Sequence, residues 1–349
     1  MKRFLPAVLG LLFLLPACSD DDTNTPPVIV PDVPRGLYIL NEGTFQRSNA
    51  SLSLYLPDSN LVFNDVFTAS TGRALGDVGN SLTIHDDKLW IVVNNSNRIE
   101  VLNLADRTPF ATVECAEGAS PRHIVFDDAG RGYISNLFRK SVSVYDAATN
   151  ALTAEITVGA NPEGLAVSQG RLFVANSGFG GGNTVSVVDL TSQQVEATLT
   201  VGDNPSAVLP LNDAAVAVLC TGAYNDFNDP LDDTPGKLYI IDTQQRAVVD
   251  SLELGGHPQR LARDADGHLY TIDGGLTRIH FPSKTLTDEF IPGFFYGLFV
   301  DTTDGRIYVS DPIDYTQAGR VAAYDLSGSE LFSFDVGVIP GAMALASPQ

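Results

Sequence analysis

The sequence predicts an all-β protein, a seven-bladed β-propeller with four-stranded blades. Two observations carry this prediction: one phrase recurs along the chain, and helix signals are nearly absent after the first 17 residues. In its clearest copy the phrase contains four short apolar strands, at residues 162–167, 171–176, 185–190 and 197–202. A unit of four strands repeating every ~40–50 residues is typical of a propeller blade.

The repeat can be followed blade by blade. The openings Pro121, Pro162, Pro205 and Pro258 are 41, 43 and 53 residues apart, and the longest step contains an insertion at residues 224–235. Equivalent units begin at residue 79 and at residue 294, the latter without its proline. An array of β-sandwiches is the alternative architecture for such a strand pattern.

The two ends of the repeat each hold part of one blade. Residues 37–41, 50–56 and 61–67 are predicted to be a second, third and fourth strand, and residues 340–345 a lone first strand. We therefore expect the C-terminal strand to pair with the N-terminal blade and close the ring. Residues 35–349 then form a single β-propeller domain.

Residues 1–17 are predicted to be a lipoprotein signal peptide. A basic start is followed by an apolar run of 12 residues, 4–15, whereas a bilayer needs about 20. The run ends in Leu15-Pro16-Ala17-Cys18, which resembles a bacterial lipobox and predicts lipidation of Cys18. An ordinary signal peptide with an incidental cysteine is the alternative.

Residues 18–34 are predicted to be a lipidated, acidic and proline-rich tether. Ser19-Asp20-Asp21-Asp22 directly follows Cys18 and resembles a surface-export signal, although a plain solvated tether is the alternative. These features predict a lipid-anchored protein of the outer membrane that faces the cell exterior.

Charge and cysteine usage narrow the possible partners. Without Lys2 and Arg3 the chain has 19 basic and 42 acidic residues, a net charge of −23. This charge disfavours nucleic acid and an anionic membrane surface as partners, so the lipid anchor is the only membrane contact that we expect. Cys115 and Cys220 fall in different blades and are expected to be buried thiols.

One face of the disc is predicted to bind a ligand. In a propeller the first strand starts, and the second strand ends, on the same face, so the residues around these points converge. Many loops there carry an aromatic residue with amides or arginines nearby, which suits a small-molecule site. The rings could alternatively cover blade edges. The candidate ligand-binding residues are Phe45, Arg47, Asp77, Asn80, Asn95, Arg122, His123, Phe138, Arg139, Glu163, Phe179, Tyr224, Phe227, Gln259, Arg260, Tyr296 and Tyr315.

The sequence motifs do not favour catalysis. There is no Ser-His-Asp order, no paired-cysteine metal spacing and no phosphate loop in context, since residues 178–182 are predicted to be a flexible hairpin with no helix after it. We expect a binding protein without a cofactor. His123 and His257 lie at blade openings, where they either bond within the rim or ligate a metal. Asp226, Asp229 and Asp232 are a weak calcium candidate, because they lack the glycine and terminal glutamate of an EF-hand loop.

The joining phrase Val-Gly-x-x-Pro and the Ala-Asn or Val-Asn endings of second strands resemble the YVTN-repeat, YncE-like propellers, over residues 37 to the C-terminus. The first blade, with Tyr38-Ile39-Leu40-Asn41-Glu42-Gly43 and residues 72–77, Gly-Arg-Ala-Leu-Gly-Asp, is similar to surface propeller lipoproteins of Bacteroidota. Some members of that group capture cobalamin and pass it to a TonB-dependent outer-membrane transporter.

This resemblance implies an extracellular binding protein for a small nutrient, with a corrinoid as the best single ligand and a TonB-dependent transporter as partner. Phe45, Phe138, Phe179, Tyr224 and Phe227 would contact the ring system, while Asn95, Arg122, Gln259 and Arg260 would bond its peripheral amides. Two alternatives stay open: a protein- or glycan-binding module at the cell surface, and a quinoprotein-like periplasmic redox protein. A quinoprotein would need a set of cofactor ligands or a modified tryptophan. The single Trp90 lies within a strand, where core packing explains it.

Overall fold

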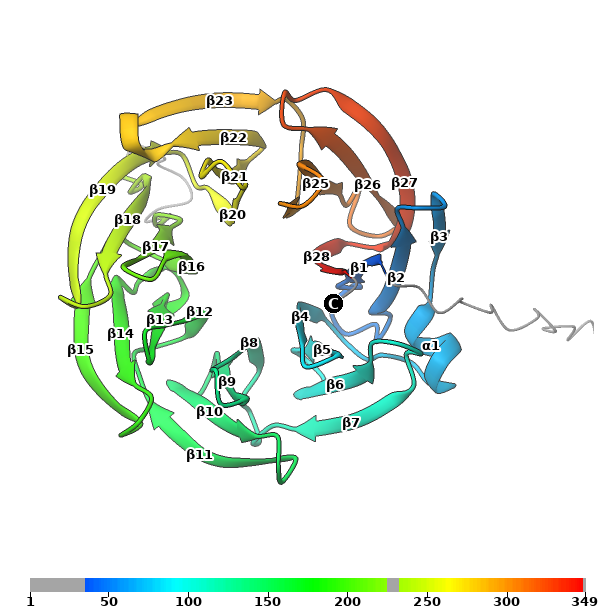
Figure 1. Ribbon diagram of the computed structural model, residues 1–349, viewed down its shortest axis with the longest axis horizontal. Coiled ribbons are helices and arrows are strands. Elements are labelled where there is room, and N and C mark those ends of the chain that lie inside the picture. Colours follow the sequence, from blue (N-terminus) through cyan, green and yellow to red (C-terminus); the bar gives the residue numbers. More distant parts are fainter. Residues whose placement is uncertain (1–34, 225–231, 348–349) are drawn as a thin grey trace, which may run out of the picture.

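The computed structural model describes residues 35–224 and 232–347, and these form a ring of seven four-stranded antiparallel sheets around a central axis (Figure 1). The prediction of a seven-bladed propeller is confirmed. Within every blade the first strand is innermost and the fourth is outermost. No helix among the described residues is long and apolar enough to cross a membrane.

The first three blades contain the chain closure and two regular units. Blade 1 has β28 (Pro340–Ala346), β1 (Gly36–Asn41), β2 (Ser51–Leu56) and β3 (Leu61–Phe63). Blade 2 has β4 (Gly79–His85), β5 (Lys88–Val93), β6 (Arg98–Asn103) and β7 (Pro109–Glu114). Blade 3 has β8 (Pro121–Phe126), β9 (Arg131–Asn136), β10 (Ser141–Asp146) and β11 (Ala151–Thr157).

The remaining four blades follow in chain order. Blade 4 has β12 (Pro162–Ser168), β13 (Arg171–Asn176), β14 (Thr184–Asp189) and β15 (Gln194–Thr200). Blade 5 has β16 (Pro205–Asn212), β17 (Ala215–Cys220), β18 (Gly236–Asp242) and β19 (Ala247–Gly255). Blade 6 has β20 (Gln259–Arg263), β21 (Leu269–Asp273), β22 (Gly275–His280) and β23 (Thr285–Ile291). Blade 7 has β24 (Gly297–Asp301), β25 (Arg306–Asp311), β26 (Ala318–Asp325) and β27 (Glu330–Val338).

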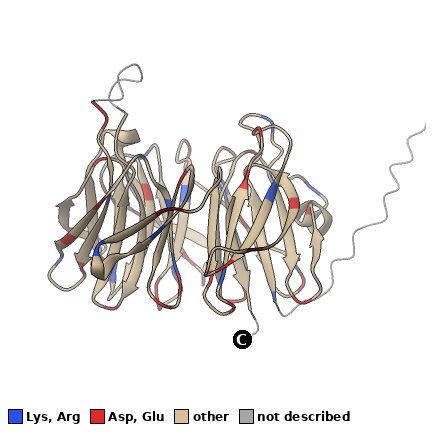
Figure 2. Ribbon diagram, turned by 90° about the horizontal axis from the view of Figure 1, so that it is seen from above, with Lys and Arg blue, Asp and Glu red and all other residues tan. Residues whose placement is uncertain are grey.

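Blade 1 closes the ring as predicted. β28 pairs antiparallel with β1, with Gly36 opposite Ala346 and Leu40 opposite Ala342. The start of β1 and the end of β28 therefore lie on one face of the disc, which we call the terminal face; Figure 2 shows the C-terminus there. The opposite face, where first strands start and second strands end, is called the mouth face.

The core lies between blades. Among the described residues seven apolar clusters are found, each shared by two neighbouring blades, including the junction of blades 7 and 1. Trp90 of β5, for example, packs on Phe126 and Tyr145 of blade 3 with ring centroids 4.8 and 5.1 Å apart. Burial at the junctions is therefore what holds the blades in a ring.

The first blade departs from the predicted strand at residues 61–67. β3 ends at Phe63, and α1 (Val66–Thr71) follows it. Asp65 has φ 56°, a left-handed conformation that interrupts the strand. Val66 and Phe67 are buried by the helix, so their apolar character reflects the inner face of α1. The loop predicted as a flexible hairpin contains instead one turn of 3-10 helix, η1 (Gly178–Gly180).

The remaining elements are small. A second 3-10 turn, η2 (Phe281–Ser283), connects β22 to β23. Cys115 and Cys220 are both buried free thiols, as predicted, and burial raises the pKa of each to about 12.

Candidate functional site

A cavity of about 490 Å³ opens in the centre of the mouth face, within the range of small-molecule sites. The starts of the innermost strands build it, because the ring brings those backbones together. Seven predicted site residues line it: Asn80, Arg122, His123, Glu163, Gln259, Arg260 and Tyr296. We call it the mouth cavity.

Two ion pairs cross the mouth cavity from blade to blade. Nε of Arg122 donates to Oε2 of Glu163 at 2.7 Å, and the same guanidinium donates to Oδ1 of Asn80. The Asn80 amide in turn donates to the carbonyl oxygen of Arg122 at 2.6 Å. These bonds link blades 2, 3 and 4 and fix the arginine side chain.

The second pair involves Glu42, a residue that the sequence prediction missed. Glu42 accepts from the hydroxyl of Tyr296 at 2.9 Å and lies 3.4 Å from Nη2 of Arg260. Arg260 also donates to the carbonyl oxygen of Tyr296 at 3.1 Å. Burial raises the pKa of Glu42 against the opposing effects of Arg260 and Tyr296, and burial and Glu42 raise the pKa of Tyr296. The signal for Glu42 was its place directly after a second strand, where a charged residue faces the mouth.

His123 lines the same cavity without a charge. Burial, followed by the nearby Arg122 and Arg260 guanidinium groups, lowers the pKa of His123 to about 3. The side chain keeps some contact with solvent, yet the inner strands surround it. Groups with perturbed pKa values gather at functional sites, and Glu42, His123 and Tyr296 are three such groups in one cavity.

Exposed aromatic side chains surround the mouth cavity on the loops of the mouth face. They form the aromatic rim, defined as Phe45, Phe138, Phe179, Tyr224, Phe294 and Tyr315, whose exposed fractions run from 40 to 67%. Phe138 and Phe179 are stacked with centroids 5.5 Å apart. Tyr315 contacts Tyr296 edge-on at 5.9 Å and thereby joins the rim to the cavity. Phe294 was not among the predicted residues, although it opens the unit that lacks its proline.

Other predicted residues lie away from the cavity wall. Asp77 is buried and accepts bonds from the Gln46 backbone N–H at 3.0 Å and the Asn95 amide at 2.5 Å, so it orders the loop that carries Phe45. Arg139 pairs with Glu155 on the outer strand β11 at 3.0 Å. Arg47 is exposed on its loop.

The structure does not place His257 in the same cavity as His123. His257 stacks on Tyr224 at 3.7 Å in the rim and does not line the mouth cavity. Cys18, Asp226, Phe227 and Asp229 lie outside the described residues, and Asp232 alone of the calcium candidates is described.

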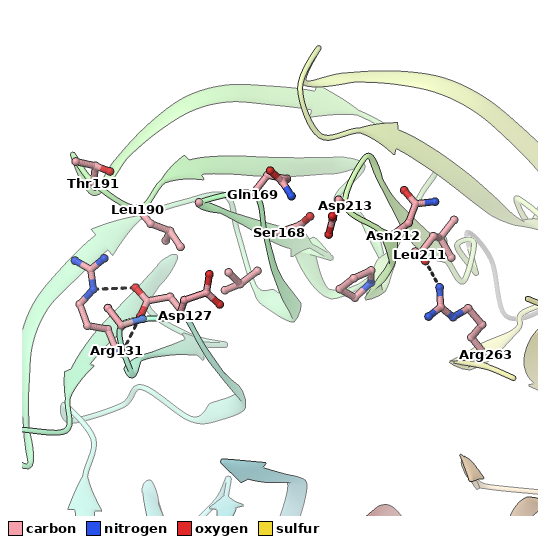
Figure 3. A pocket seen from close by; sticks show the side chains of 15 residues that line it. Asp127, Arg131, Ser168, Gln169, Leu190, Thr191, Leu211, Asn212, Asp213 and Arg263 are labelled. Atoms are coloured by element: carbon pink, nitrogen blue, oxygen red, sulfur yellow. Dashed lines mark hydrogen bonds and ion pairs between the residues drawn. The ribbon is translucent and has the colours of Figure 1, made fainter. Parts of the chain in front are cut away.

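A second cavity, of about 640 Å³, lies on the terminal face, and no predicted site residue lines it. Figure 3 shows that hairpin turns of blades 3, 4 and 5 form it, with the Asp127–Arg131 pair at one end and Arg263 beside Leu211 at the other. Its charged groups are engaged in turns: Asp127 holds Arg131 at 2.8 Å, and Arg263 donates to the carbonyl oxygen of Leu211. The mouth cavity has the stronger set of perturbed groups.

Comparison with solved structures supports the fold. The chain is similar to the periplasmic gluconolactonase of Pseudomonas aeruginosa, with a TM-score of 0.66 and 14% identity over 90% of this chain and 100% of that one. It is also similar to a quinoprotein alcohol dehydrogenase-like protein of Bacteroides thetaiotaomicron, with a TM-score of 0.67 and 12% identity over 90% and 78%. Hydrazine synthase of Kuenenia stuttgartiensis matches with a TM-score of 0.64 and 15% identity over 77% and 92%. At such identities the likeness concerns the fold alone.

No curated protein matches the chain. A family model described as "Domain of unknown function (DUF5074)" matches residues 35–221, which run from the first strand of the ring through the second strand of blade 5. The match covers more than half of the sequence, and the chain therefore belongs to the DUF5074 family.

Proposed function

We propose that this protein is a lipid-anchored binding protein of the cell surface that captures a small nutrient at the mouth face. The observation that carries the proposal is the combination of the aromatic rim with the polar mouth cavity. Exposed rings offer contact area for an apolar or planar ligand, and the groups below them offer directed hydrogen bonds. A cavity of about 490 Å³ favours a small molecule over a flat protein partner.

The charge balance of the mouth cavity indicates a neutral ligand. Each arginine already has a carboxylate partner, Glu163 for Arg122 and Glu42 for Arg260. A charged ligand would have to displace one of these carboxylates. A neutral ligand rich in amides or hydroxyls can bond to Gln259, Asn80 and the arginine edges without breaking the pairs.

The start of the described chain is compatible with a lipid anchor on the face opposite the mouth cavity. β1 starts on the terminal face, so a tether from Cys18 would reach the ring there and leave the mouth face turned away from the membrane. A TonB-dependent transporter is the proposed recipient of the ligand, on the strength of the resemblance in the first blade. A corrinoid, a large ring system bearing peripheral amides, is the ligand that we propose.

The test is a titration of the purified protein with cyanocobalamin, followed by calorimetry and by the absorbance of the corrin ring. Saturable binding at micromolar protein is expected, and Phe179→Ala and Arg260→Ala should each weaken it. Phe110→Ala is the matched control, since Phe110 is also an exposed ring (46%) but lies on the outer strand β7. Absence of heat and of any spectral change would rule out a corrinoid, and binding of neutral oligosaccharides in the same assay would favour the glycan alternative.

A further inference from the structure

Blade 6 replaces a recurrent pair of the fold with two histidines. Where the second strand begins opposite the end of the third, other blades place a basic residue against a carboxylate: Arg131 opposite Asp146, Arg171 opposite Asp189 and Arg306 opposite Asp325. In blade 6 Leu269 pairs with Ile279. His268, one residue before Leu269, therefore stands opposite His280, one residue after Ile279. Their ring centroids are 5.5 Å apart.

The turn of blade 6 does not need a histidine to fold. In blade 3, Oδ1 and Oδ2 of Asp127 accept from the backbone N–H and Nε of Arg131 at 2.9 and 2.8 Å, and the Tyr133 hydroxyl donates to Oδ2 at 2.9 Å. In blade 6, Asp264 holds the backbone and Nδ1 of His268 at 2.8 and 3.0 Å, and the Tyr270 hydroxyl at 2.9 Å. Arginine and histidine thus serve the same turn, and the two imidazoles need another explanation.

The hydrogen bonds of both rings leave the same nitrogen available. Nδ1 of His268 faces the buried Asp264 carboxylate, which fixes the tautomer that has its lone pair on Nε2. Nδ1 of His280 lies 2.6 Å from Oγ of Ser283, and this hydroxyl is 3.3 Å from the His280 carbonyl oxygen, to which it donates. The Ser283 oxygen can therefore accept from Nδ1–H, which again leaves Nε2 for a ligand.

We infer that blade 6 binds a borderline divalent cation, of the Zn²⁺, Ni²⁺ or Cu²⁺ class, through His268, His280 and Asp266 on the terminal face. Imidazole suits these metals, and a carboxylate completes the donor set. Ligand atoms of Asp266 and His268 lie within 4.8 Å of each other and of the Asp264 carboxylate. The ring centroid of His280 lies 5.5 Å from that of His268. Asp266 and His280 are exposed, so both can rotate to the ~2.0–2.2 Å bonds that Zn²⁺ requires. Asp264 orients His268 from behind, and water occupies the remaining position.

The site is tested with the full chain, without a polyhistidine tag and after chelator treatment, by calorimetric titration with ZnCl₂. One equivalent is expected to bind with micromolar affinity. His268→Arg introduces the residue that blade 3 has at the same turn, so the turn is kept while a ligand is lost. His268→Arg and His280→Ala should each weaken Zn²⁺ binding at least tenfold. His85→Ala is the control, because His85 also stands beside a carboxylate, Asp86, at a terminal-face turn, and it should bind as the unaltered protein does.

X-ray absorption at the zinc edge gives an independent readout. Two imidazoles and oxygen donors are expected in the bound state. The inference is overturned if the unaltered protein does not bind Zn²⁺ at millimolar concentration, if both variants bind it with unchanged affinity, or if the spectrum shows sulfur from Cys115 or Cys220.

Discussion

Gly159, at the end of one blade, lies directly against the side chain of Asn176, at the end of the second strand of the next. A Cβ at position 159 would be 2.4 Å from Cγ of Asn176, which is too close for any real contact. Asn176 in turn donates to the hydroxyls of Thr184 and Ser186 at 3.1 and 3.0 Å. Gly337 lies against Asn41 in the same way, because a Cβ at position 337 would be 2.6 Å from Nδ2 of Asn41. The glycine of the recurrent Val-Gly therefore makes room for the asparagine side chain of the next blade.

We predict that Gly159→Ala lowers the free energy of unfolding by about 1–3 kcal/mol, the usual cost of overpacking. The glycine at the end of blade 4, Gly202, has its nearest atoms at 3.1–3.2 Å, so Gly202→Ala should cost less. Gly181→Ala is the control, because its Cβ would meet nothing closer than 3.6 Å. Urea unfolding measures all three, and equal stability of Gly159→Ala and Gly181→Ala would contradict the junction.

Arg35 is predicted to secure the closed ring. Its guanidinium lies 2.6 Å from Asp301 and 2.7 Å from Asp304, and Asp301 is 1% exposed. Arg35→Ala would leave the Asp301 carboxylate buried without its cation, and such losses cost about 3–5 kcal/mol. Asp304→Asn removes only the more exposed partner and should cost below about 1 kcal/mol. Denaturant unfolding compares the variants, and equal losses would contradict the role assigned to Asp301.

His123 is predicted to make stability depend on pH. Its pKa in the folded protein is about 3, whereas an unfolded histidine titrates near its ordinary value of about 6.5. The unfolded chain therefore binds more protons between these values, so the free energy of unfolding falls as the pH drops from about 6.5 toward 3. His123→Gln should remove on the order of 3 kcal/mol of this fall between pH 7 and pH 4.

Two measurements check the prediction for His123. Denaturant unfolding at pH 7 and pH 4 gives the difference between the variant and the unaltered protein. An NMR titration of the imidazole Cε1–H reports the protonation directly, and the signal should keep its neutral position down to about pH 4. A titration near pH 6.5 would contradict the burial of this ring.

The stacked pair Phe138 and Phe179 is predicted to act in binding and not in stability. Both rings are largely exposed, at 60 and 67%, so replacing either with alanine should change the free energy of unfolding by no more than about 0.5 kcal/mol. Affinity for cyanocobalamin should fall about tenfold, as is usual for an aromatic contact residue. Thermal melts and the corrin absorbance separate the two effects, and a variant that unfolds early while binding normally would assign the pair to packing.

The repeat predicted the fold well because each blade packs its apolar strands against the next blade in the same way. Strand lengths, the closing glycine and the terminal asparagine are local consequences of one junction, and they recur with the sequence. Residues 64–71 escaped prediction because Val66 and Phe67 are as apolar as strand residues, and only the left-handed Asp65 marks the start of a helix. Departures from the repeat are visible in sequence, but the conformation that replaces it is not.

The sequence predicted the face on which the mouth cavity lies, but only some of the residues that line it. Blade topology alone brought Arg122, Glu163 and Arg260 to one face, and the structure places them in one cavity. Glu42 was missed because its partners Arg260 and Tyr296 are more than 200 residues away in the chain, and the pairing depends on how the ring closes. The second cavity was missed because its lining residues read as ordinary hairpin turns.

The composite first blade also sets an order on folding. β1 has its neighbour β28 some 300 residues further along the chain, so this contact has one of the largest sequence separations that the chain permits. Blades 2 to 7 can assemble from local hairpins as they emerge, but the seam between the first and last strands forms only when residues 340–346 are present. Contacts of such long range slow folding, and until the seam forms, β1 and the inner edge of blade 1 stay open to pairing with another chain.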